Sequence, residues 1–183
     1  MEKQLLNMTT TFNILPATES DVDTILDLIR QLSAYEKLEH MVTGDEAMLR
    51  VALFGKVPSC ECVIARDGVE PIGFALYFTT FSTFLCKAGL YLEDLFVIPT
   101  ARGHGHGKAL LKYLAALAVS RDCGRFEWRV LDWNTPSINF YKSLGATIMP
   151  EWHLVRMTEP EIAVLAGNPP KGGYNNNCNT YRI

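Results

Sequence analysis

The stretch Arg102-Gly103-His104-Gly105-His106-Gly107-Lys108 joins two segments of different character. Residues 90–98 form an apolar run that stops at Pro99, and residues 109–120 repeat apolar side chains with the period of a helix. Alternating glycines let the backbone turn with its N–H groups directed inward. A helix that begins here adds its unpaired first-turn N–H groups and the positive end of its dipole. The stretch therefore predicts a loop that binds a pyrophosphate.

Two common phosphate-binding motifs do not match this loop. A Walker P-loop requires glycine where Arg102 stands and serine or threonine where Ala109 stands. The dinucleotide pattern G-x-G-x-x-G requires its last glycine at the position of Lys108. The pattern that does match is R-x-x-G-x-G, with Arg102, Gly105 and Gly107 at its fixed positions. On this stretch alone, an ordinary solvated turn between a strand and a helix is the alternative.

Length and composition indicate one globular domain. The chain has 183 residues, of which 48% are hydrophobic, and we expect a single domain over residues 12–166. A flexible N-terminus, 1–11, precedes it, and a flexible Gly/Pro/Asn-rich tail, 167–183, follows. The net charge of −3 argues against nucleic acid or an anionic membrane as a partner. Without a run long enough for a membrane span or a signal core, we expect a cytoplasmic protein.

The cysteines and histidines do not form a recognisable metal motif. Cys60 and Cys62 form a C-x-C pair, but no second pair or suitably spaced histidine completes a zinc site. We interpret all five cysteines as reduced and structural. His104 and His106 are interpreted as loop histidines, so no metal is expected.

Hydrophobic periodicity and turn residues predict an α/β chain with a mixed sheet. Helix-period stripes with caps predict helices from Ser20, from residue 43 to near Gly55, and over 107–121, 136–144 and 158–166. Strands are predicted at 12–17, 60–65, 72–78, 90–98, 126–131, 146–149 and 152–157, with a loop over 81–87. An antiparallel N-terminal part leads into a βαβ crossover that pairs 90–98 with 126–131 in parallel. Ligands bind at the carboxyl ends of such strands, where the glycine loop lies.

Six stretches in this order carry a family resemblance. They are Leu28-Ile29-Arg30-Gln31-Leu32, Tyr35-Glu36-Lys37-Leu38, Tyr91-Leu92-Glu93-Asp94, the loop 102–107, Leu131-Asp132-Trp133-Asn134, and Ser137-Ile138-Asn139-Phe140-Tyr141-Lys142. Together they resemble the GNAT superfamily of N-acetyltransferases, and within it the spermidine/spermine N-acetyltransferase family, which includes thialysine acetyltransferases. The resemblance implies the acyl-CoA N-acyltransferase fold. In that fold a central, mostly antiparallel sheet contains one splayed parallel strand pair and is flanked by helices. It also implies acetyl-CoA as co-substrate and a homodimer.

Two catalytic residues follow from the resemblance. Tyr141 matches the family's general acid, and a phenol with a reference pKa of about 10 can protonate a thiolate whose pKa is about 8.5. Glu93 matches the carboxylate that anchors the substrate ammonium and helps to take its proton. The alternatives are packing of Tyr141 beside Phe140 and a structural ion pair for Glu93 or Asp94. As neighbours on a strand, the two carboxylates point to opposite faces unless a bulge intervenes.

The same resemblance assigns residues to the two substrates. The cofactor residues are Leu95, Phe96, Val97, Arg102, Gly103, His104, Gly105, His106, Gly107, Lys108, Asn134, Pro136, Ser137 and Tyr141. Asn134 is equally explained as a helix N-cap. The residues expected to bind the acceptor amine are Tyr35, Glu36, Glu93, Glu127, Trp128, Arg129 and Glu151. For these, a solvated or ion-paired surface role is the alternative.

The sequence therefore predicts direct, acetyl-CoA-dependent transfer of an acetyl group to a primary amine of a small molecule. The candidate acceptors are a diamine or polyamine and a thialysine-like or lysine-like amino acid. Arg129 is unusual in a cation site and favours an acceptor that carries a carboxylate. A protein N-terminal or lysine acetyltransferase and a non-catalytic acetyl-CoA-binding module are the alternatives. The presence of both Glu93 and Tyr141 argues against the second of these.

Overall fold

The computed structural model describes residues 12–168, and these fall into two compact units. The first unit ends at Leu131, and the second begins at Asp132. The flexible ends expected at 1–11 and 169–183 lie outside the described residues. Among the described residues, no helix is long and apolar enough to cross a membrane. A single domain over 12–166 stays a prediction, and the two units are described separately below.

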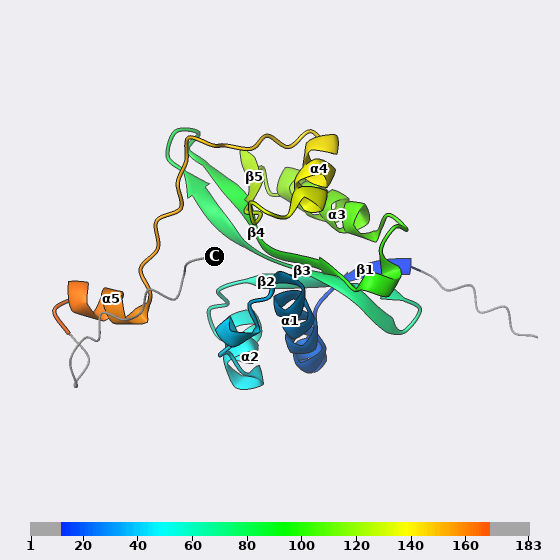
Figure 1. Cartoon of the computed structure of the whole chain (residues 1–183), viewed down its shortest axis with the longest axis horizontal. Helices are drawn as coiled ribbons and strands as arrows, with labels where there is room; N and C mark the ends of the chain where they lie inside the picture. The colour runs from blue at the N-terminus through cyan, green and yellow to red at the C-terminus, as the bar shows by residue number, and fades with distance from the viewer. Residues whose placement is uncertain (1–11, 169–183) are drawn as a thin grey trace, which may run out of the picture. The chain divides into compact units, whose positions relative to one another are not determined.

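The first unit is built on a five-stranded sheet with the strand order β1-β2-β3-β4-β5 (Figure 1). The strands are β1 (Phe12–Pro16), β2 (Glu61–Asp67), β3 (Glu70–Ser82), β4 (Lys87–Val97) and β5 (Arg125–Trp128). The first four strands pair antiparallel, and β4 and β5 pair in parallel. This arrangement confirms the predicted mixed sheet with one parallel pair.

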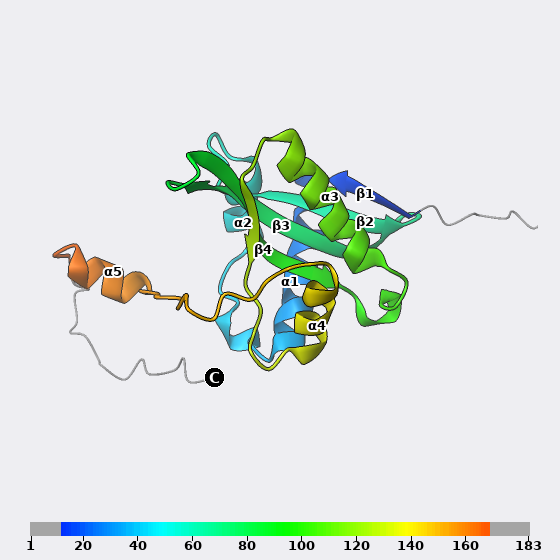
Figure 2. The same ribbon diagram turned by 90° about the horizontal axis from the view of Figure 1, so that it is seen from above.

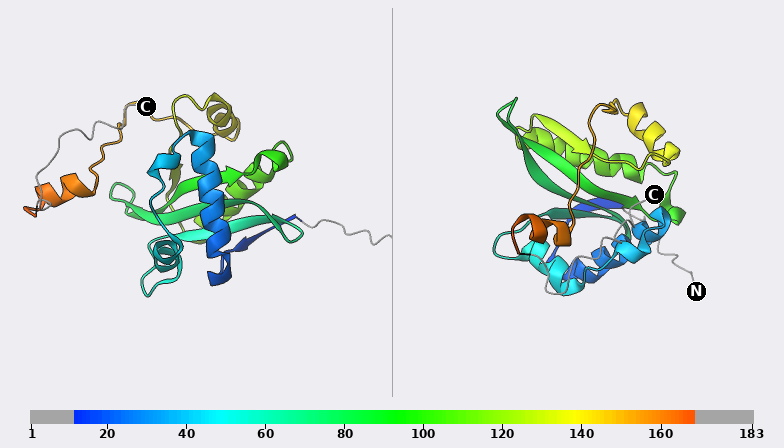
Figure 3. Two further views of the ribbon diagram at one scale, coloured as in Figure 1. Left: turned by 60° about the horizontal axis from the view of Figure 1, so that its bottom comes forward. Right: turned by 60° about the vertical axis from the view of Figure 1, so that its left-hand side comes forward.

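Three helices cover the two faces of this sheet. α1 (Val22–Glu36) and α2 (Glu46–Phe54) lie on one face, and α3 (His106–Ser120) lies on the other (Figures 1 and 2). The view from below shows α1 crossing the strands of the sheet (Figure 3). Asp45 caps α2, since its side chain accepts a hydrogen bond from the Met48 N–H. α3 is the crossover helix between the parallel strands, as predicted from residues 107–121.

The core between α1, α2 and the sheet consists of apolar side chains at helix and strand periodicity. Its buried members are Ile25, Leu28, Leu32, Leu53, Cys62, Ile64, Phe74, Leu76 and Phe96. The face of α1 that was identified by its period of 3.6 residues is therefore the one that packs on the sheet. Burial of these side chains provides the main stabilisation of this layer.

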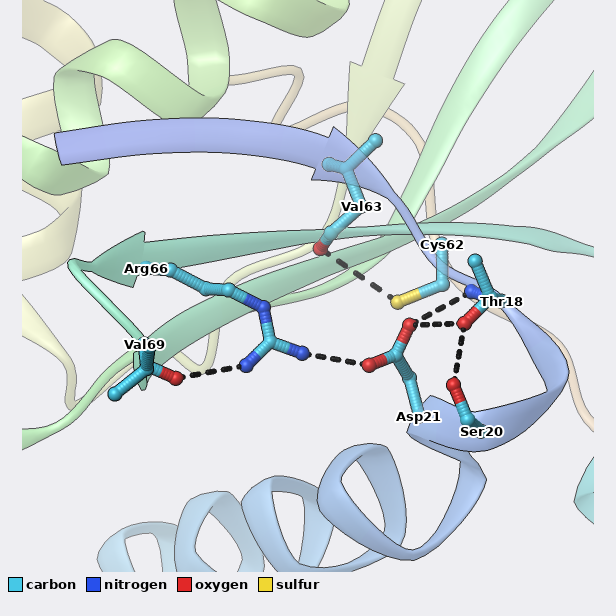
Figure 4. A network of polar contacts seen from close by, with 7 residues as sticks. All are labelled: Thr18, Ser20, Asp21, Cys62, Val63, Arg66 and Val69. Atoms are coloured by element: carbon cyan, nitrogen blue, oxygen red, sulfur yellow. Dashed lines mark hydrogen bonds and ion pairs between the residues drawn. The ribbon is translucent and has the colours of Figure 1, made fainter. Parts of the chain in front are cut away.

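A polar network ties the start of α1 to β2 (Figure 4). One carboxylate oxygen of Asp21 accepts hydrogen bonds from the backbone N–H and the hydroxyl of Thr18, each 2.8 Å long. The other accepts from the guanidinium of Arg66 at 2.6 Å, and that guanidinium also donates to the Val69 carbonyl at 3.1 Å. Burial raises the pKa of Asp21, but the Thr18 hydrogen bonds and the Arg66 charge outweigh it, so the pKa lies below its ordinary value.

The hairpin between β3 and β4 differs from the expected loop over 81–87. β3 continues to Ser82, β4 begins at Lys87, and these two residues are the last pair of the ladder. The connection is therefore a turn of residues 83–86, with Cys86 at a φ of 49°. Residues 79 and 80 are both threonine, a β-branched residue that fits a strand in spite of its polarity.

The second unit contains two helices, α4 (Thr135–Ser143) and α5 (Glu159–Leu165). Thr158 and Glu161 form the capping box predicted at the start of α5. The strands predicted at 146–149 and 152–157 are wrong, because neither segment is a strand in the structure. Alternating hydrophobicity identifies a segment able to pair, but a strand forms only when another strand accepts its backbone hydrogen bonds. No described strand pairs with either segment.

Candidate active site

The glycine loop lies between the 3-10 turn Pro99–Ala101 and α3. Gly103 and Gly105 have φ values of 83° and 85°, in the left-handed region that favours glycine. Gly105 is the N-cap of α3 and has no side chain to accept from the first-turn N–H groups. A Cβ placed on either glycine would meet no atom within 4 Å, so the loop opens into free space. This cradle of N–H groups at a helix N-terminus fits the pyrophosphate of a coenzyme A ligand.

The strand that leads to this loop has an open edge. Pairing between β4 and β5 ends at Leu92 and Trp128, but β4 continues to Val97 along β3. The Ile98 N–H bonds to the Ile72 carbonyl on the β3 side. Because successive residues direct their backbone groups to opposite edges, the N–H groups of Val97 and Leu95 face the open edge. They can donate to the carbonyl groups of an acyl-pantetheine chain.

Phe96 contributes its side chain rather than its backbone to this region. Its backbone faces β3, and its ring is only 3% exposed in the core layer. The guanidinium carbon of Arg102 lies 5.6 Å from the centre of this ring. Phe96 therefore supports the side of the loop, in addition to being part of the strand that was expected to hold the cofactor.

A β-bulge at Glu93 changes the direction of the neighbouring carboxylates. Leu92 is opposite Tyr77 and Asp94 is opposite Leu76, so the register passes over Glu93. Since Leu76 and Tyr77 point to opposite faces, Leu92 and Asp94 do so too, although they are two residues apart. Asp94 consequently shares the α1/α2 face with Glu93. Glu93 and Asp94 therefore do not point to opposite faces, because a bulge intervenes between them and the regular strand pattern.

Glu36, Glu93 and Asp94 form a carboxylate cluster. Burial raises the pKa of Asp94 to about 7, and the charges of Glu93 and Glu36 add to this effect. Burial also raises the pKa of Glu36, the last residue of α1. Among the described residues, no lysine, arginine or histidine forms an ion pair with any of the three. Their environment favours the arrival of a cation from solution.

Replacing Asp94 with asparagine is expected to raise the free energy of unfolding near about pH 8 and to change it little near about pH 4. The folded-state pKa of about 7 lies above the ordinary value of 3.8, so the folded state holds the proton more tightly. The stability from this proton is fully present below 3.8 and is lost as the pH rises to about 7. Near about pH 8, the free energy of unfolding of the Asp94→Asn variant should exceed that of the wild type by at most about 4 kcal/mol.

Urea unfolding of wild type and variant at the two pH values measures this difference. Asp23→Asn, an exposed carboxylate in the first turn of α1, is the matched control. A stability difference for Asp94→Asn that is the same at both pH values would contradict the prediction.

Side chains of β5 and the residue after it lie on both faces of the sheet. Glu127 is beside Tyr91 on β4, and its carboxylate is 2.7 Å from the Arg125 Nε. Arg129 lies with its guanidinium 5.5 Å from the centre of the Tyr91 ring. Tyr91 is two residues before Glu93, so Arg129 is on the same face as the carboxylate cluster. Trp128 is beside Leu92 on the opposite face, where its ring contacts Phe126.

The thiols of the half-buried Cys60 and the buried Cys62 are not nucleophiles. Burial raises the pKa of Cys60, and the charges of Glu61 and Glu93 raise it further. Burial also raises the pKa of Cys62. Both side chains are therefore thiols rather than reactive thiolates at neutral pH.

Five of the predicted site residues, Asn134, Pro136, Ser137, Tyr141 and Glu151, belong to the second unit. Asn134 is 6% exposed and caps α4, because its side-chain oxygen accepts from the Ser137 N–H at 3.3 Å. Pro136 is in the first turn of the same helix. Tyr141 is 8% exposed, and its ring centre lies 5.4 Å from that of Phe140. Glu151 is an exposed residue in the segment before α5.

Residues 26–146 match the model of the acetyltransferase (GNAT) family. The chain belongs to this family. The thialysine N-epsilon-acetyltransferase of Mus musculus is 36% identical over 165 residues, covering 84% of this chain and 96% of that protein. The L-ornithine N5-acetyltransferase of Arabidopsis thaliana is 31% identical, covering 81% of this chain and 85% of that protein.

A solved structure agrees with this assignment. An integron cassette protein from the mobile metagenome of V. cholerae superposes with a TM-score of 0.72 at 26% identity, covering 85% of this chain and 97% of that one. This structure supports the fold, and the family match with the two named relatives identifies the chain as an N-acetyltransferase. The family uses acetyl-CoA as co-substrate, and the glycine loop and the open edge of β4 fit that molecule.

Sequence reasoning missed two features of the site. Asp94 was assigned only a structural ion pair, whereas the bulge places it with Glu93 and Glu36. Arg102 was expected only among the cofactor residues, but it also contacts Tyr35 of α1. No sequence pattern indicates either feature. The position of Asp94 depends on strand register, and the contact of Arg102 depends on the packing of α1 against the loop.

Proposed function

We propose that this GNAT enzyme acetylates the side-chain amine of a small lysine-like amino acid, with thialysine as the model acceptor. The observation that carries the proposal is the carboxylate cluster of Glu36, Glu93 and Asp94, which has no cationic partner among the described residues, with Arg129 on the same face of the sheet. The carboxylates suit an ammonium group, and the exposed ring of Tyr35 adds a cation–π surface. Arg129 suits an α-carboxylate.

Each group of residues has one role in this proposal. Acetyl-CoA supplies the acetyl group as a thioester when it is bound. The N–H groups of 103–108 hold its pyrophosphate, and those of Leu95 and Val97 donate to the carbonyl oxygen, where negative charge develops. Glu93 anchors the acceptor ammonium and takes a proton from its nitrogen. Tyr141 donates its phenolic proton to the departing sulfur.

The other expectations belong to the same proposal. Asn134, Pro136 and Ser137 contribute to the cofactor site, and Glu127, Trp128 and Glu151 to the acceptor site, on the basis of the family resemblance. The cytoplasmic location and the homodimer are proposed on the same basis. The named relatives act on amino acids or their analogues by their descriptions, which supports a lysine-like acceptor over a long polyamine.

The test is a panel of amines assayed by release of the CoA thiol from acetyl-CoA. We expect kcat/KM for thialysine, lysine and ornithine to exceed that for spermine, because Arg129 attracts an α-carboxylate and repels a second ammonium. In Arg129→Ala, the ratio of kcat/KM for thialysine to kcat/KM for spermine should fall about tenfold. Arg50→Ala, on the exposed surface of α2, is the matched control. A higher kcat/KM for spermine in the unmodified enzyme would refute the proposed acceptor.

A further inference from the structure

Arg102 connects the cofactor loop to the acceptor helix. Its Nε donates to the Val97 carbonyl at the end of β4, at 2.9 Å. Its guanidinium carbon lies 4.5 Å from the centre of the Tyr35 ring, in the last turn of α1. The same guanidinium carbon lies 5.6 Å from the centre of the Phe96 ring. One side chain of the cofactor loop therefore touches two strand residues and one residue expected to bind the amine.

Backbone geometry holds both partners of this contact. The 3-10 turn Pro99–Ala101 folds the chain back, and the Arg102 N–H bonds to the Pro99 carbonyl at 3.3 Å. Lys37, the residue that caps the end of α1, has a φ of 61°, and the Leu38 N–H bonds to the Ser33 carbonyl at 2.8 Å. Arg102 and Tyr35 therefore contact each other from two segments whose backbones are held in place by these hydrogen bonds.

The guanidinium has donors left for an anion. The guanidinium group of arginine carries five N–H groups. Of the five on Arg102, only the Nε–H forms a hydrogen bond to another residue within 12–168. Arg102 is an exposed residue at the start of the glycine loop. A phosphate oxygen that accepts from its Nη groups would fix the plane of the guanidinium, and with it the position of the Tyr35 ring stacked on it.

We propose that Arg102 is a positioning residue that couples binding of acetyl-CoA to binding of the acceptor amine. The inference rests on the proposed function. The pyrophosphate fixes the position of the Arg102 guanidinium, which in turn fixes the position of the Tyr35 ring. The adjacent Glu36 is then positioned to bind the ammonium group. Because such a coupling is thermodynamic, the amine must strengthen cofactor binding by the same factor.

The chain offers variants that separate charge from stacking. Arg102→Lys keeps the positive charge but removes the planar group and the Nε donor. Tyr35→Phe keeps the ring and loses only the hydroxyl, whereas Tyr35→Leu removes the aromatic face. Arg50→Lys is the matched control, since Arg50 pairs with Glu19 on the surface of α2 and away from the loop.

Calorimetric titration of thialysine, with and without saturating CoA, measures the coupling as the ratio of the two dissociation constants. In the wild type we expect thialysine to bind at least about fivefold more tightly with CoA, and CoA to gain the same factor from thialysine. The ratio should fall to below about twofold in Arg102→Lys and Tyr35→Leu. It should keep its wild-type value in Tyr35→Phe and Arg50→Lys.

Three results would overturn the coupling. They are a wild-type ratio of one, an unchanged ratio in Arg102→Lys, and a Tyr35→Leu variant that loses thialysine affinity equally with and without CoA. Absence of thialysine binding in either state would overturn it as well. Failure of the proposed function is a different result. In that case, no amine of the panel causes the wild-type enzyme to release the CoA thiol from acetyl-CoA.

Discussion

Replacing Tyr141 with phenylalanine is expected to lower kcat by about 10²–10⁴-fold, with little change in the dissociation constant of acetyl-CoA. The phenylalanine ring preserves the packing of a residue that is 8% exposed in α4. It removes only the proton that the proposed mechanism gives to the departing thiolate. With reference pKa values of about 10 for tyrosine and about 8.5 for a thiol, that proton transfer is close to balanced and gains from a positioned donor.

Steady-state kinetics with thialysine, together with a calorimetric titration of acetyl-CoA, measure the two quantities separately. Tyr113→Phe, which removes a hydroxyl from the half-buried Tyr113 of α3, is the matched control. If Tyr141→Phe turned over at nearly the wild-type rate, Tyr141 would have a packing role only.

The second large effect is expected at Glu93. Glu93→Gln keeps the shape of the side chain but can neither attract an ammonium nor accept its proton, so kcat/KM should fall by at least about 100-fold at neutral pH. The variant then depends on the small fraction of acceptor that is already deprotonated. Because a lysine-like amine has a pKa of about 10, its kcat/KM should rise about tenfold for each pH unit up to that value.

A pH profile of kcat/KM for both proteins measures this difference in slope. Glu70→Gln is the matched control, since Glu70 is an exposed carboxylate at the start of β3. The role of Glu93 would be refuted by a Glu93→Gln profile that runs parallel to that of the wild type at similar magnitude.

Local features of the site could be predicted because short segments determine them. Gly103 and Gly105 are at positive φ, as alternating glycines before a helix indicate. Asn134 caps α4, one of the two roles expected for it, because the nearest backbone N–H groups are sufficient partners. The parallel pairing of β4 and β5 followed from the helix between them, since such a crossover reverses the chain direction twice.

Some elements could not be predicted because a strand forms only where another strand pairs with it. The segments 146–149 and 152–157 have the hydrophobic alternation of strands, but no described strand pairs with them. β3 and β4 extend further than predicted, since pairing with each other stabilises polar residues such as Thr79 and Thr80 in a strand. In both cases the hydrogen bonds of the backbone, and not the side-chain pattern, decided the outcome.

By itself, the sequence determined which residue types the chain brings to its chemistry and the shape of the loop that holds a pyrophosphate. It also determined the family, through motifs in a recognisable order. Only the tertiary structure decided how the charges meet. The bulge at Glu93 arises from the register between β3 and β4, and it turns Asp94 toward the same face. The stack of Arg102 on Tyr35 requires the end of α1 to pack against the end of β4. Both depend on contacts between distant segments, which local propensity does not encode.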